Sequence, residues 1–206
     1  MNQMYNSEKH HRRSIRLKGY DYSLAGTYFV TICVKERKCV FGDVQNSNVV
    51  LSPIGEIVYQ CWNEIPNNFN SVKLYVFIVM PNHLHGIVVM TNDCSRGVQL
   101  NAPTRNASNF YGLISPKQKT LSVIIRTFKA AVTTLCRKNN YHFFELQRNY
   151  YEHIVRNEDE LNRIREYIIN NPLQWQFDKE NPNRIQDNTY DNQWSHFEEG
   201  IYGKTK

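Results

Sequence analysis

KLYVFIVMPNHLHGIVVM, residues 73–90, contains two stretches rich in apolar and β-branched residues on either side of a Met-Pro-Asn sequence. Stretches of this length and composition predict β-strands, here over residues 73–79 and 83–90. Proline and asparagine are typical of turns, so the short connection predicts that the two strands pair with each other. The sequence therefore predicts a β-hairpin in the middle of the chain, and the rest of the fold is predicted around it.

The segments on both sides of this hairpin alternate between strand and helix patterns. Residues 27–34 and 49–51 predict strands, residues 53–65 a helix that stops at Pro66, residues 121–138 a second helix, residues 142–146 and 150–155 extended segments, and residues 157–171 a last helix that ends at Pro172. The order β-α-β-β-α-β followed by a helix is typical of a ferredoxin-like α+β sandwich, with helices on one face of an antiparallel sheet.

The chain of 206 residues fits one domain with appendages. The sequence predicts a polar, basic N-terminal arm over residues 1–20 and a folded domain over residues 21–175. Within that domain, the polar stretch of about residues 91–119 is too long for a simple connection and is interpreted as an insertion. Residues 176–206 are interpreted as a C-terminal tail.

Composition excludes several classes of protein. No stretch reaches the roughly 18 apolar residues that a membrane span needs, and the N-terminus lacks the apolar core of a secretory signal. The five cysteines are dispersed and include no Cys-x-x-Cys pair, which argues against a disulfide scaffold or a structural zinc knuckle. We therefore expect a cytoplasmic protein with no membrane partner.

The net charge of +6 suits a polyanionic partner such as nucleic acid. Aromatic residues make up 13% of the chain and offer surfaces on which unpaired bases stack. A basic surface that binds nothing is the alternative explanation of the charge. The candidate DNA-binding residues are Arg12, Arg13, Arg16 and Lys18 in the arm, and Arg126 and Lys129 on the second predicted helix.

His83 and His85 are separated by one residue on a predicted strand, so their side chains point to the same face, about 6–7 Å apart along it. Leu84 points to the other face. Two imidazoles arranged in this way can hold one divalent cation, and histidine suits Mn²⁺ better than Mg²⁺. Histidines satisfied within the sheet are the alternative, and the motif alone does not decide between them.

Tyr167 and Asn171 lie four residues apart on the last predicted helix and therefore on one face of it. The amide oxygen of Asn171 is a hard ligand of the kind that Mg²⁺ and Mn²⁺ accept. With His83 and His85 it would complete a three-ligand site whose open positions a phosphate could fill. The alternative is that Tyr167 packs in the core and that Asn171 caps the helix.

Several segments resemble one family, the tyrosine transposases associated with repeated extragenic palindromes (REP). Residues 80–85, MPNHLH, resemble the family's His-hydrophobe-His motif, and residues 167–172, YIINNP, resemble its YIxxNP segment. Residues 147–156, QRNYYEHIVR, are similar to the stretch that precedes that segment, where Leu146 stands in place of the family's tryptophan. The resemblance extends over about residues 12–175.

The resemblance implies membership of the one-tyrosine, single-strand transposases with a His-hydrophobe-His site, which occur in bacterial insertion sequences. It implies His83, His85 and Asn171 as ligands of Mg²⁺ or Mn²⁺, and Tyr167 as the nucleophile that forms a 5′-phosphotyrosine. The implied partner is single-stranded DNA, in particular hairpins of repeated extragenic palindromes. Members of the family are thought to act as monomers, whereas some relatives exchange the tyrosine helix within a homodimer, so both states stay open.

Tyr150 and Tyr151 are rival nucleophiles, because alternation along a strand would turn one of them toward the histidines. Tyr167 is preferred because Asn171 lies one helical turn away. Three alternatives to the transposase function remain: a domesticated protein that binds DNA hairpins without cutting, a nicking enzyme of the replication-initiator or relaxase type, and a small metal-dependent hydrolase.

Overall fold

The computed structural model describes residues 21–22, 24–91, 120–178 and 180–186. The predicted arm with Arg12, Arg13, Arg16 and Lys18, nearly all of the predicted insertion, and the tail after residue 186 lie outside these residues. The described residues cover most of the predicted domain and the first part of the tail.

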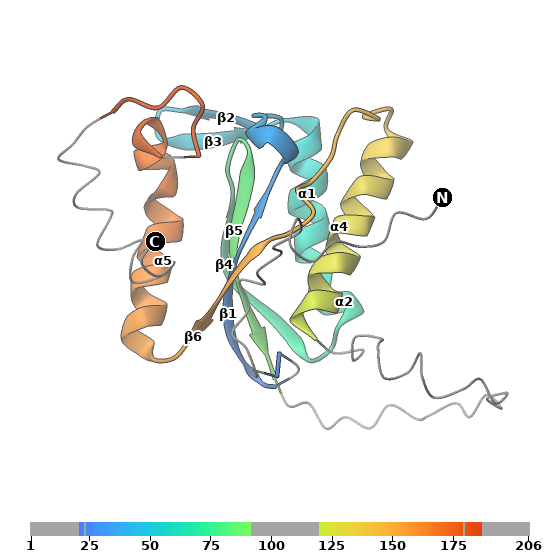
Figure 1. Ribbon diagram of the computed structural model, residues 1–206, viewed down its shortest axis with the longest axis vertical. Coiled ribbons are helices and arrows are strands. Elements are labelled where there is room, and N and C mark those ends of the chain that lie inside the picture. The colour runs from blue at the N-terminus through green and yellow to red at the C-terminus, as the bar shows by residue number, and fades with distance from the viewer. Residues whose placement is uncertain (1–20, 23, 92–119, 179, 187–206) are drawn as a thin grey trace, which may run out of the picture.

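A four-stranded antiparallel sheet forms the centre of the structure (Figure 1). The strands lie in the order β4-β5-β1-β6, and each neighbouring pair is antiparallel. Their bounds are β1 Gly26–Cys33, β4 Val72–Val79, β5 His83–Met90 and β6 Tyr151–Val155. The predicted hairpin is confirmed as β4 and β5, with Val79 opposite Leu84 beside the turn. This arrangement is that of a ferredoxin-like sheet, so the predicted α+β class is confirmed.

Helices cover both faces of this sheet (Figure 1). One face carries α1 Pro53–Asn63, the short α2 Ile65–Asn68 and α4 Leu121–Lys138. The opposite face carries α5 Glu158–Gln174, which packs on β1 and β5 through a second, smaller apolar cluster. Smaller elements are the hairpin of β2 Gly42–Gln45 and β3 Asn48–Leu51, and the 3₁₀ turns η1 Lys35–Arg37 and η2 Trp175–Phe177.

Each of the three long helices begins at a side chain that accepts a hydrogen bond from the first turn. Ser52 accepts from the Gly55 backbone N–H before α1, and Thr120 accepts from Val123 before α4. Asn157 accepts from the Glu160 N–H at 2.8 Å before α5, as its position in the sequence predicts. Glu160 itself accepts from the Arg156 N–H, so the carboxylate binds one residue earlier than a capping box requires.

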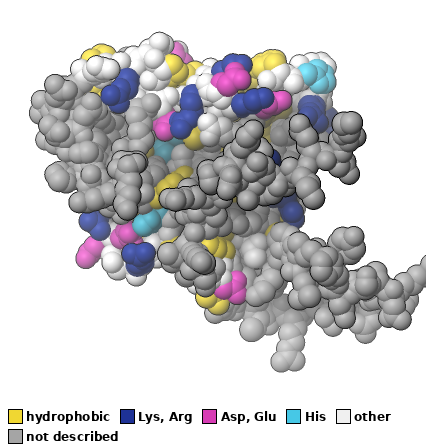
Figure 2. Space-filling model, in the orientation of Figure 1, with side chains coloured by type: hydrophobic (Ala, Val, Ile, Leu, Met, Phe, Trp, Pro, Cys, Tyr) yellow, Lys and Arg dark blue, Asp and Glu magenta, His cyan; other side chains and the backbone are white. Residues whose placement is uncertain are grey.

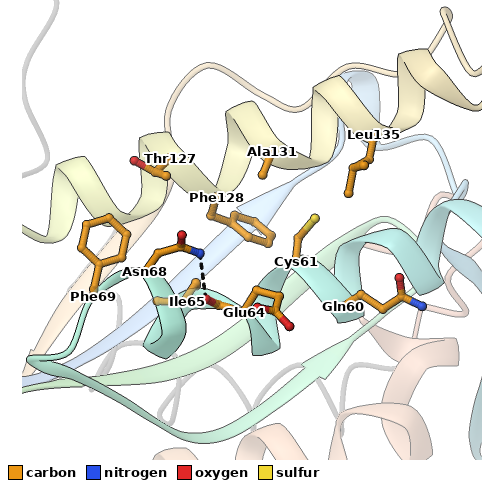
Figure 3. Close-up of a pocket in the computed structure, with 10 residues that line it drawn as sticks. All are labelled: Gln60, Cys61, Glu64, Ile65, Asn68, Phe69, Thr127, Phe128, Ala131 and Leu135. Carbon is orange, nitrogen blue, oxygen red and sulfur yellow. Dashed lines mark hydrogen bonds between the residues drawn. The ribbon is translucent and has the colours of Figure 1, made fainter.

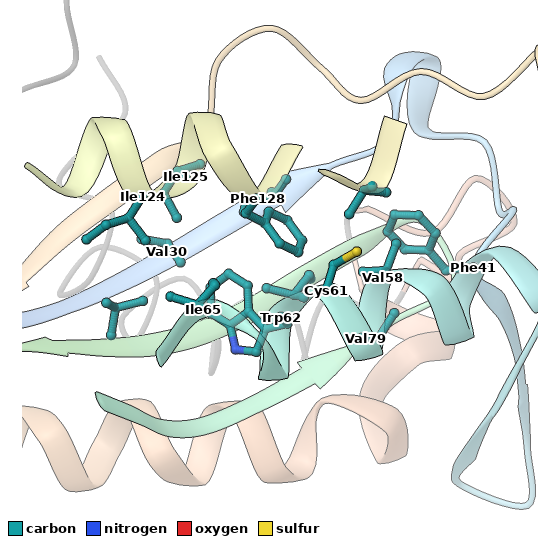
Figure 4. Packing of buried hydrophobic residues seen from close by; sticks show 14 of the residues in the cluster. Val30, Phe41, Val58, Cys61, Trp62, Ile65, Val79, Ile124, Ile125 and Phe128 are labelled. Carbon is teal, nitrogen blue, oxygen red and sulfur yellow. The ribbon is translucent and has the colours of Figure 1, made fainter. Parts of the chain in front are cut away.

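The main core lies between the sheet and the helices α1 and α4 (Figure 4). Trp62 of α1 is fully buried and meets Phe128 of α4 edge-to-face, with ring centroids 5.2 Å apart. An apolar stripe at helical spacing runs along α4 through Leu121, Ile124, Ile125, Phe128, Val132 and Leu135. Its first five residues are buried, whereas Leu135 is 37% exposed and Cys136 is buried instead. The stripe is displaced by one position at the end of α4.

Gly86 on β5 makes room for Trp62, which gives a prediction about stability. A Cβ atom at Gly86 would lie 2.5 Å from Cζ2 of Trp62, so we expect Gly86→Ala to lower the free energy of unfolding by about 1–3 kcal/mol. Chemical denaturation measures the change. Gly26→Ala on β1 is the control, because its nearest contact is the Tyr28 hydroxyl at 3.3 Å. Equal losses in both variants would contradict the packing argument.

Several predicted details are wrong. The helices cover both faces of the sheet and not one, because α5 packs on the face opposite α1 and α4. Pro66 does not stop the first helix, because α1 already ends at Asn63 and Pro66 lies in the first turn of α2. Pro172 does not end the last helix, because α5 continues to Gln174; the proline lies in the last turn, where the helix tolerates the single backbone hydrogen bond that it removes. Residues 142–146 form turns and one isolated bridge, between Leu146 and Val34, instead of an extended segment. The bridge lies just beyond the end of β1. Among the described helices, none is long and apolar enough to cross a lipid bilayer.

Candidate active site

The two histidines lie on the face of β5 that α5 covers, while Leu84 between them belongs to the main core, as the alternation along the strand predicts. His83 is 0% and His85 1% exposed. Their ring centroids are 4.4 Å apart. The pair is therefore buried and close enough for both rings to face one small ligand.

Backbone hydrogen bonds hold the turn before the histidines in place. The carbonyl of Pro81 accepts from the Phe41 N–H, and the carbonyl of Asn82 accepts from Val34 at the end of β1. The carbonyl of His83 accepts from the Met80 N–H and closes the turn. The turn between β4 and β5 is thus fixed against neighbouring segments on each side.

Each imidazole is held through its Nδ1 atom. Nδ1 of His83 lies 2.8 Å from Oδ1 of Asn82, and Nδ1 of His85 lies 2.9 Å from Oγ1 of Thr31 on β1. The Nε2 atoms are left for other partners. Nε2 of His85 lies 3.2 Å from the Tyr167 hydroxyl, whereas Nε2 of His83 is buried with no hydrogen-bond partner. In histidines that bind a metal through one ring nitrogen, the other ring nitrogen typically makes a hydrogen bond of this kind.

One face of α5 runs over the histidine pair. Tyr167 contacts His85, and Trp175, just past the end of the helix, lies beside His83 with ring centroids 6.1 Å apart. Asn171 is midway between them on the same helical face and is 2% exposed. Its Oδ1 atom is buried without a hydrogen-bond partner. The helix therefore carries a phenol and an amide oxygen toward the two imidazoles.

Two buried polar atoms without partners, Nε2 of His83 and Oδ1 of Asn171, fit a bound cation. Buried polar atoms are rarely left without partners, so two such atoms, one on β5 and one on the helix that covers it, require an explanation. Nitrogen and amide oxygen together form a donor set that Mn²⁺ or Mg²⁺ accepts. Nowhere in the described part of the chain do three His, Cys, Asp or Glu side chains gather, so this set depends on the asparagine as its third member.

Burial lowers the pKa of His83 to about 3, with a smaller contribution from the positive charge of Arg37. The imidazole is therefore neutral near pH 7, which is the form that binds metals. The free unfolded side chain has a pKa of about 6.5.

This shift predicts how the stability of the metal-free protein depends on pH. Between pH 6.5 and 3 the unfolded chain binds a proton at His83 that the folded chain does not, so stability falls as the pH falls through this window. We expect His83 to contribute a loss on the order of 3–5 kcal/mol, measured by denaturation at a series of pH values. His83→Leu should flatten the profile.

The rival tyrosines lie on opposite faces of the sheet, as alternation predicts. Tyr150 packs on the main core, and Lys129 lies over its ring at 5.5 Å from the centroid. Tyr151 packs with Phe29 on the α5 face, so it is the rival that shares a face with the histidines. Burial, and to a lesser extent the charge of Glu160, raises the pKa of Tyr151 well above its usual value. Ionising Tyr151 is therefore harder than ionising a free phenol.

The two predicted DNA-binding residues that the structure describes have different surroundings. Arg126 is exposed on α4. The Lys129 ammonium donates to the carbonyls of Gln147 and Asn149, each at 2.8 Å, and burial lowers its pKa to about 8. Lys129 thus ties α4 to the segment before β6, and its role in binding DNA stays a prediction. On the face shown in Figure 2, described basic and acidic side chains lie side by side.

An apolar groove of about 380 Å³ lies between α1, α2 and α4 (Figure 3). Phe69, Phe128 and Leu135 contribute to its lining, and Asn68 donates to the Glu64 carbonyl at its edge. The groove lies on the side of the sheet opposite Tyr167. It carries no part of the candidate site.

Sequence reasoning missed three residues that hold the site. Asn82 lies in the turn of the predicted hairpin, where the pattern indicates only a turn. Its position directly before His83 is the signal that could have identified it as a hydrogen-bond partner of that histidine. Thr31 contacts His85 only because β1 lies beside β5, which requires knowledge of the strand order. Trp175 stands at the predicted end of the domain, and its spacing from Tyr167 and Asn171, which is that of one helical face, is the signal that could have found it.

Comparison with known proteins identifies a relative in sequence and a solved structure of similar fold. No family model matches the chain. A protein of Haemophilus influenzae that is described as uncharacterized is 44% identical over 186 residues, which are 87% of this chain and 98% of the relative. The solved structure of a REP-associated tyrosine transposase bound to a REP hairpin aligns with a TM-score of 0.50 and 16% identity, over 77% of this chain and 74% of that one. At this identity the structural similarity shows the fold.

Proposed function

This chain belongs to the same family as the uncharacterized Haemophilus influenzae protein, and we propose that it is a transposase-like enzyme that cuts and rejoins single-stranded DNA through Tyr167. The observation that supports this most directly is the 3.2 Å contact between the Tyr167 hydroxyl and Nε2 of His85. A phenol and two imidazoles meet there, with the amide oxygen of Asn171 on the same helical face. The fold shared with a hairpin-bound transposase agrees with this chemistry.

The proposed metal ligands are Nε2 of His83, Nε2 of His85 and Oδ1 of Asn171. Mg²⁺ or Mn²⁺ at this position would polarise the scissile phosphate and neutralise the charge that develops on it. Without a metal, the Tyr167 hydroxyl is hydrogen-bonded to Nε2 of His85, and Thr31 holds the opposite nitrogen of the same ring. The protein thus keeps its nucleophile beside the ligands before the reaction begins.

In the proposed reaction the Tyr167 oxygen attacks phosphorus in line with the leaving 3′-oxygen. A bond from Tyr167 to the 5′-phosphate forms, the bond to the 3′-oxygen breaks, the phenol loses its proton and the 3′-oxygen gains one. The phosphotyrosine conserves the energy of the broken bond, so a 3′-hydroxyl can attack it and rejoin the strand without a nucleotide cofactor. All four proposed groups come from one chain, so the site needs no second subunit.

The proposed partner is single-stranded DNA folded as a hairpin, by analogy with the hairpin-bound transposase of the same fold. Phosphate contacts are assigned to Arg12, Arg13, Arg16 and Lys18 in the arm and to Arg126 on α4, with Lys129 as a weaker candidate. Neutralising several phosphates makes affinity fall steeply with salt.

The decisive experiment incubates the full chain with end-labelled single-stranded hairpins and Mn²⁺ or Mg²⁺, followed by denaturing electrophoresis. A metal-dependent protein–DNA adduct that disappears with EDTA supports the proposal. Product release without an adduct would favour a hydrolase, and binding without cleavage on a broad set of hairpins would favour a domesticated hairpin-binding protein. Nicking followed by transfer only within a replication-origin sequence would favour the replication-initiator type.

A further inference from the structure

The segment that follows α5 reaches back to the turn before the histidines. We call this segment, residues 175–178 and 180, the strap. Its Glu180 pairs through the carboxylate with the Arg37 guanidinium, and its backbone carbonyl accepts a hydrogen bond of 2.6 Å from Nδ2 of Asn82. The Glu180 N–H is in turn held by the Asp178 carboxylate at 2.7 Å. The strap therefore contacts the candidate site through Asn82, the residue before His83.

Asn82 is fully buried, and its hydrogen bonds fix which way its amide points. Nδ2 carries two hydrogens, and both have backbone carbonyls as acceptors, Glu180 at 2.6 Å and Arg37 at 3.0 Å. An amide oxygen in that place would face two acceptors, so the nitrogen must occupy it. Oδ1 is consequently the atom that faces His83.

This orientation also fixes the tautomer of His83. Oδ1 of Asn82 can only accept, so Nδ1 of His83, 2.8 Å away, must carry the hydrogen. In the neutral ring Nε2 then holds the lone pair, and this is the buried atom without a hydrogen-bond partner. His85 differs, because the Thr31 hydroxyl can both donate and accept and does not by itself select a tautomer.

We propose that Asn82 and Glu180 are positioning residues of the candidate site, so that the strap keeps Nε2 of His83 available to a divalent cation. The inference rests on the proposed function for its metal, but the tautomer follows from the hydrogen bonds alone. Arg37 supports the same contact, since its carbonyl and its guanidinium meet Asn82 and Glu180 respectively. Its φ of +56° is a conformation that residues other than glycine rarely adopt, and neighbours must hold it there.

The test uses the full chain in four forms: wild type, Asn82→Ala, Glu180→Ala and the double variant Arg37→Ala/Glu180→Ala. Long-range ¹H–¹⁵N spectra report the tautomer of each histidine, and titration with Mn²⁺ alone reports metal affinity. Glu145→Ala is the matched control, because Glu145 pairs with Lys35, which lies in the same 3₁₀ turn as Arg37. His85 serves as an internal control within each spectrum.

In the wild type we expect hydrogen on Nδ1 of His83. In Asn82→Ala we expect a mixture of tautomers and an affinity for Mn²⁺ lower by about 10–100-fold, as for the loss of other residues that orient a metal ligand. Glu180→Ala should lower the affinity by roughly 3–10-fold, and the double variant by no more, because both substitutions break one ion pair. Glu145→Ala should match the wild type.

The proposal is overturned if Asn82→Ala and Glu180→Ala keep the wild-type tautomer and affinity within about twofold. If Asn82→Ala does not fold, Glu180→Ala and the double variant decide, because their ion pair lies near the surface. A changed tautomer in a protein whose wild type never cuts DNA would leave this inference standing and remove the proposed function. If the wild type cuts DNA and every variant keeps the wild-type tautomer, the proposed function stands and this inference fails.

Discussion

Tyr167→Phe is expected to form no covalent adduct with hairpin DNA, and its strand cleavage should be slower by roughly 10⁴–10⁶-fold, the range seen when a nucleophile is removed from an enzyme. The substitution removes one oxygen from a ring that is 7% exposed and leaves its contact with Phe29 in place. The fold should therefore survive. Single-turnover cleavage of labelled hairpin in Mn²⁺, resolved on denaturing gels, measures the loss.

Tyr151→Phe is the matched control for this experiment. Tyr151 shares the α5 face of the sheet with the histidines, but burial raises its pKa and makes its oxygen hard to ionise. We expect cleavage by Tyr151→Phe to stay within about threefold of the wild type. An adduct that persists in Tyr167→Phe and vanishes in Tyr151→Phe would transfer the role of nucleophile to Tyr151.

Tyr167→Phe should also affect metal binding in the opposite direction. In the metal-free protein the Tyr167 hydroxyl occupies Nε2 of His85, and a cation must displace this hydrogen bond. A hydrogen bond of this kind contributes about 1 kcal/mol, which corresponds to about fivefold in affinity. The same variant that cannot cut should thus bind Mn²⁺ slightly more tightly than the wild type.

The second large effect is expected for Asn171→Leu, which removes the proposed third ligand without changing the size of the side chain much. Metal-dependent cleavage should fall by at least about 10³-fold, because the cation supplies several kcal/mol of charge stabilisation at the phosphate. At the same time, the free energy of unfolding of the metal-free protein should rise by about 1 kcal/mol, because the buried Oδ1 has no hydrogen-bond partner and removing such an atom removes its desolvation cost.

The opposed changes in activity and stability separate this prediction from a general loss of structure. Cleavage assays, titration with Mn²⁺ and urea denaturation of the same preparation measure the three quantities. Asn162→Leu is the control, since Asn162 is exposed on the same helix and accepts a hydrogen bond from Arg165 there. If Asn171→Leu destabilises the protein and retains metal-dependent cleavage, the amide oxygen is structural and the ligand assignment is wrong.

Much of the fold was predictable because local patterns and tertiary packing agree along the chain. The hairpin of β4 and β5 follows from two apolar runs and a Pro-Asn turn, and alternation correctly sends His83 and Leu84 to opposite faces. The capping of α5 by Asn157 follows in the same way from one side chain and its position.

The parts that could not be predicted depend on which element packs where. The apolar stripe of α5 shows that the helix packs against something, but not that it covers the second face of the sheet. The contact of Thr31 with His85 could be predicted only with knowledge of the strand order. The hydrogen bonds from Lys129 to the segment before β6 could be predicted only with knowledge of how that segment runs past α4. The prediction at Pro172 is wrong because a proline stops a helix only where the lost hydrogen bond and the ring cannot be accommodated.

The cluster beneath α5 is much smaller than the main core, and this difference sets how the molecule opens. Its buried members are Phe29, Ile87, Ile164, Tyr167 and Ile168, whereas α1 and α4 rest on a far larger set of buried residues. Partial unfolding follows such differences, since the unit with the fewest buried contacts detaches at the lowest free energy. We therefore expect the backbone amides of α5, the helix that carries the proposed nucleophile, to exchange their hydrogens with solvent faster than those of α1 and α4.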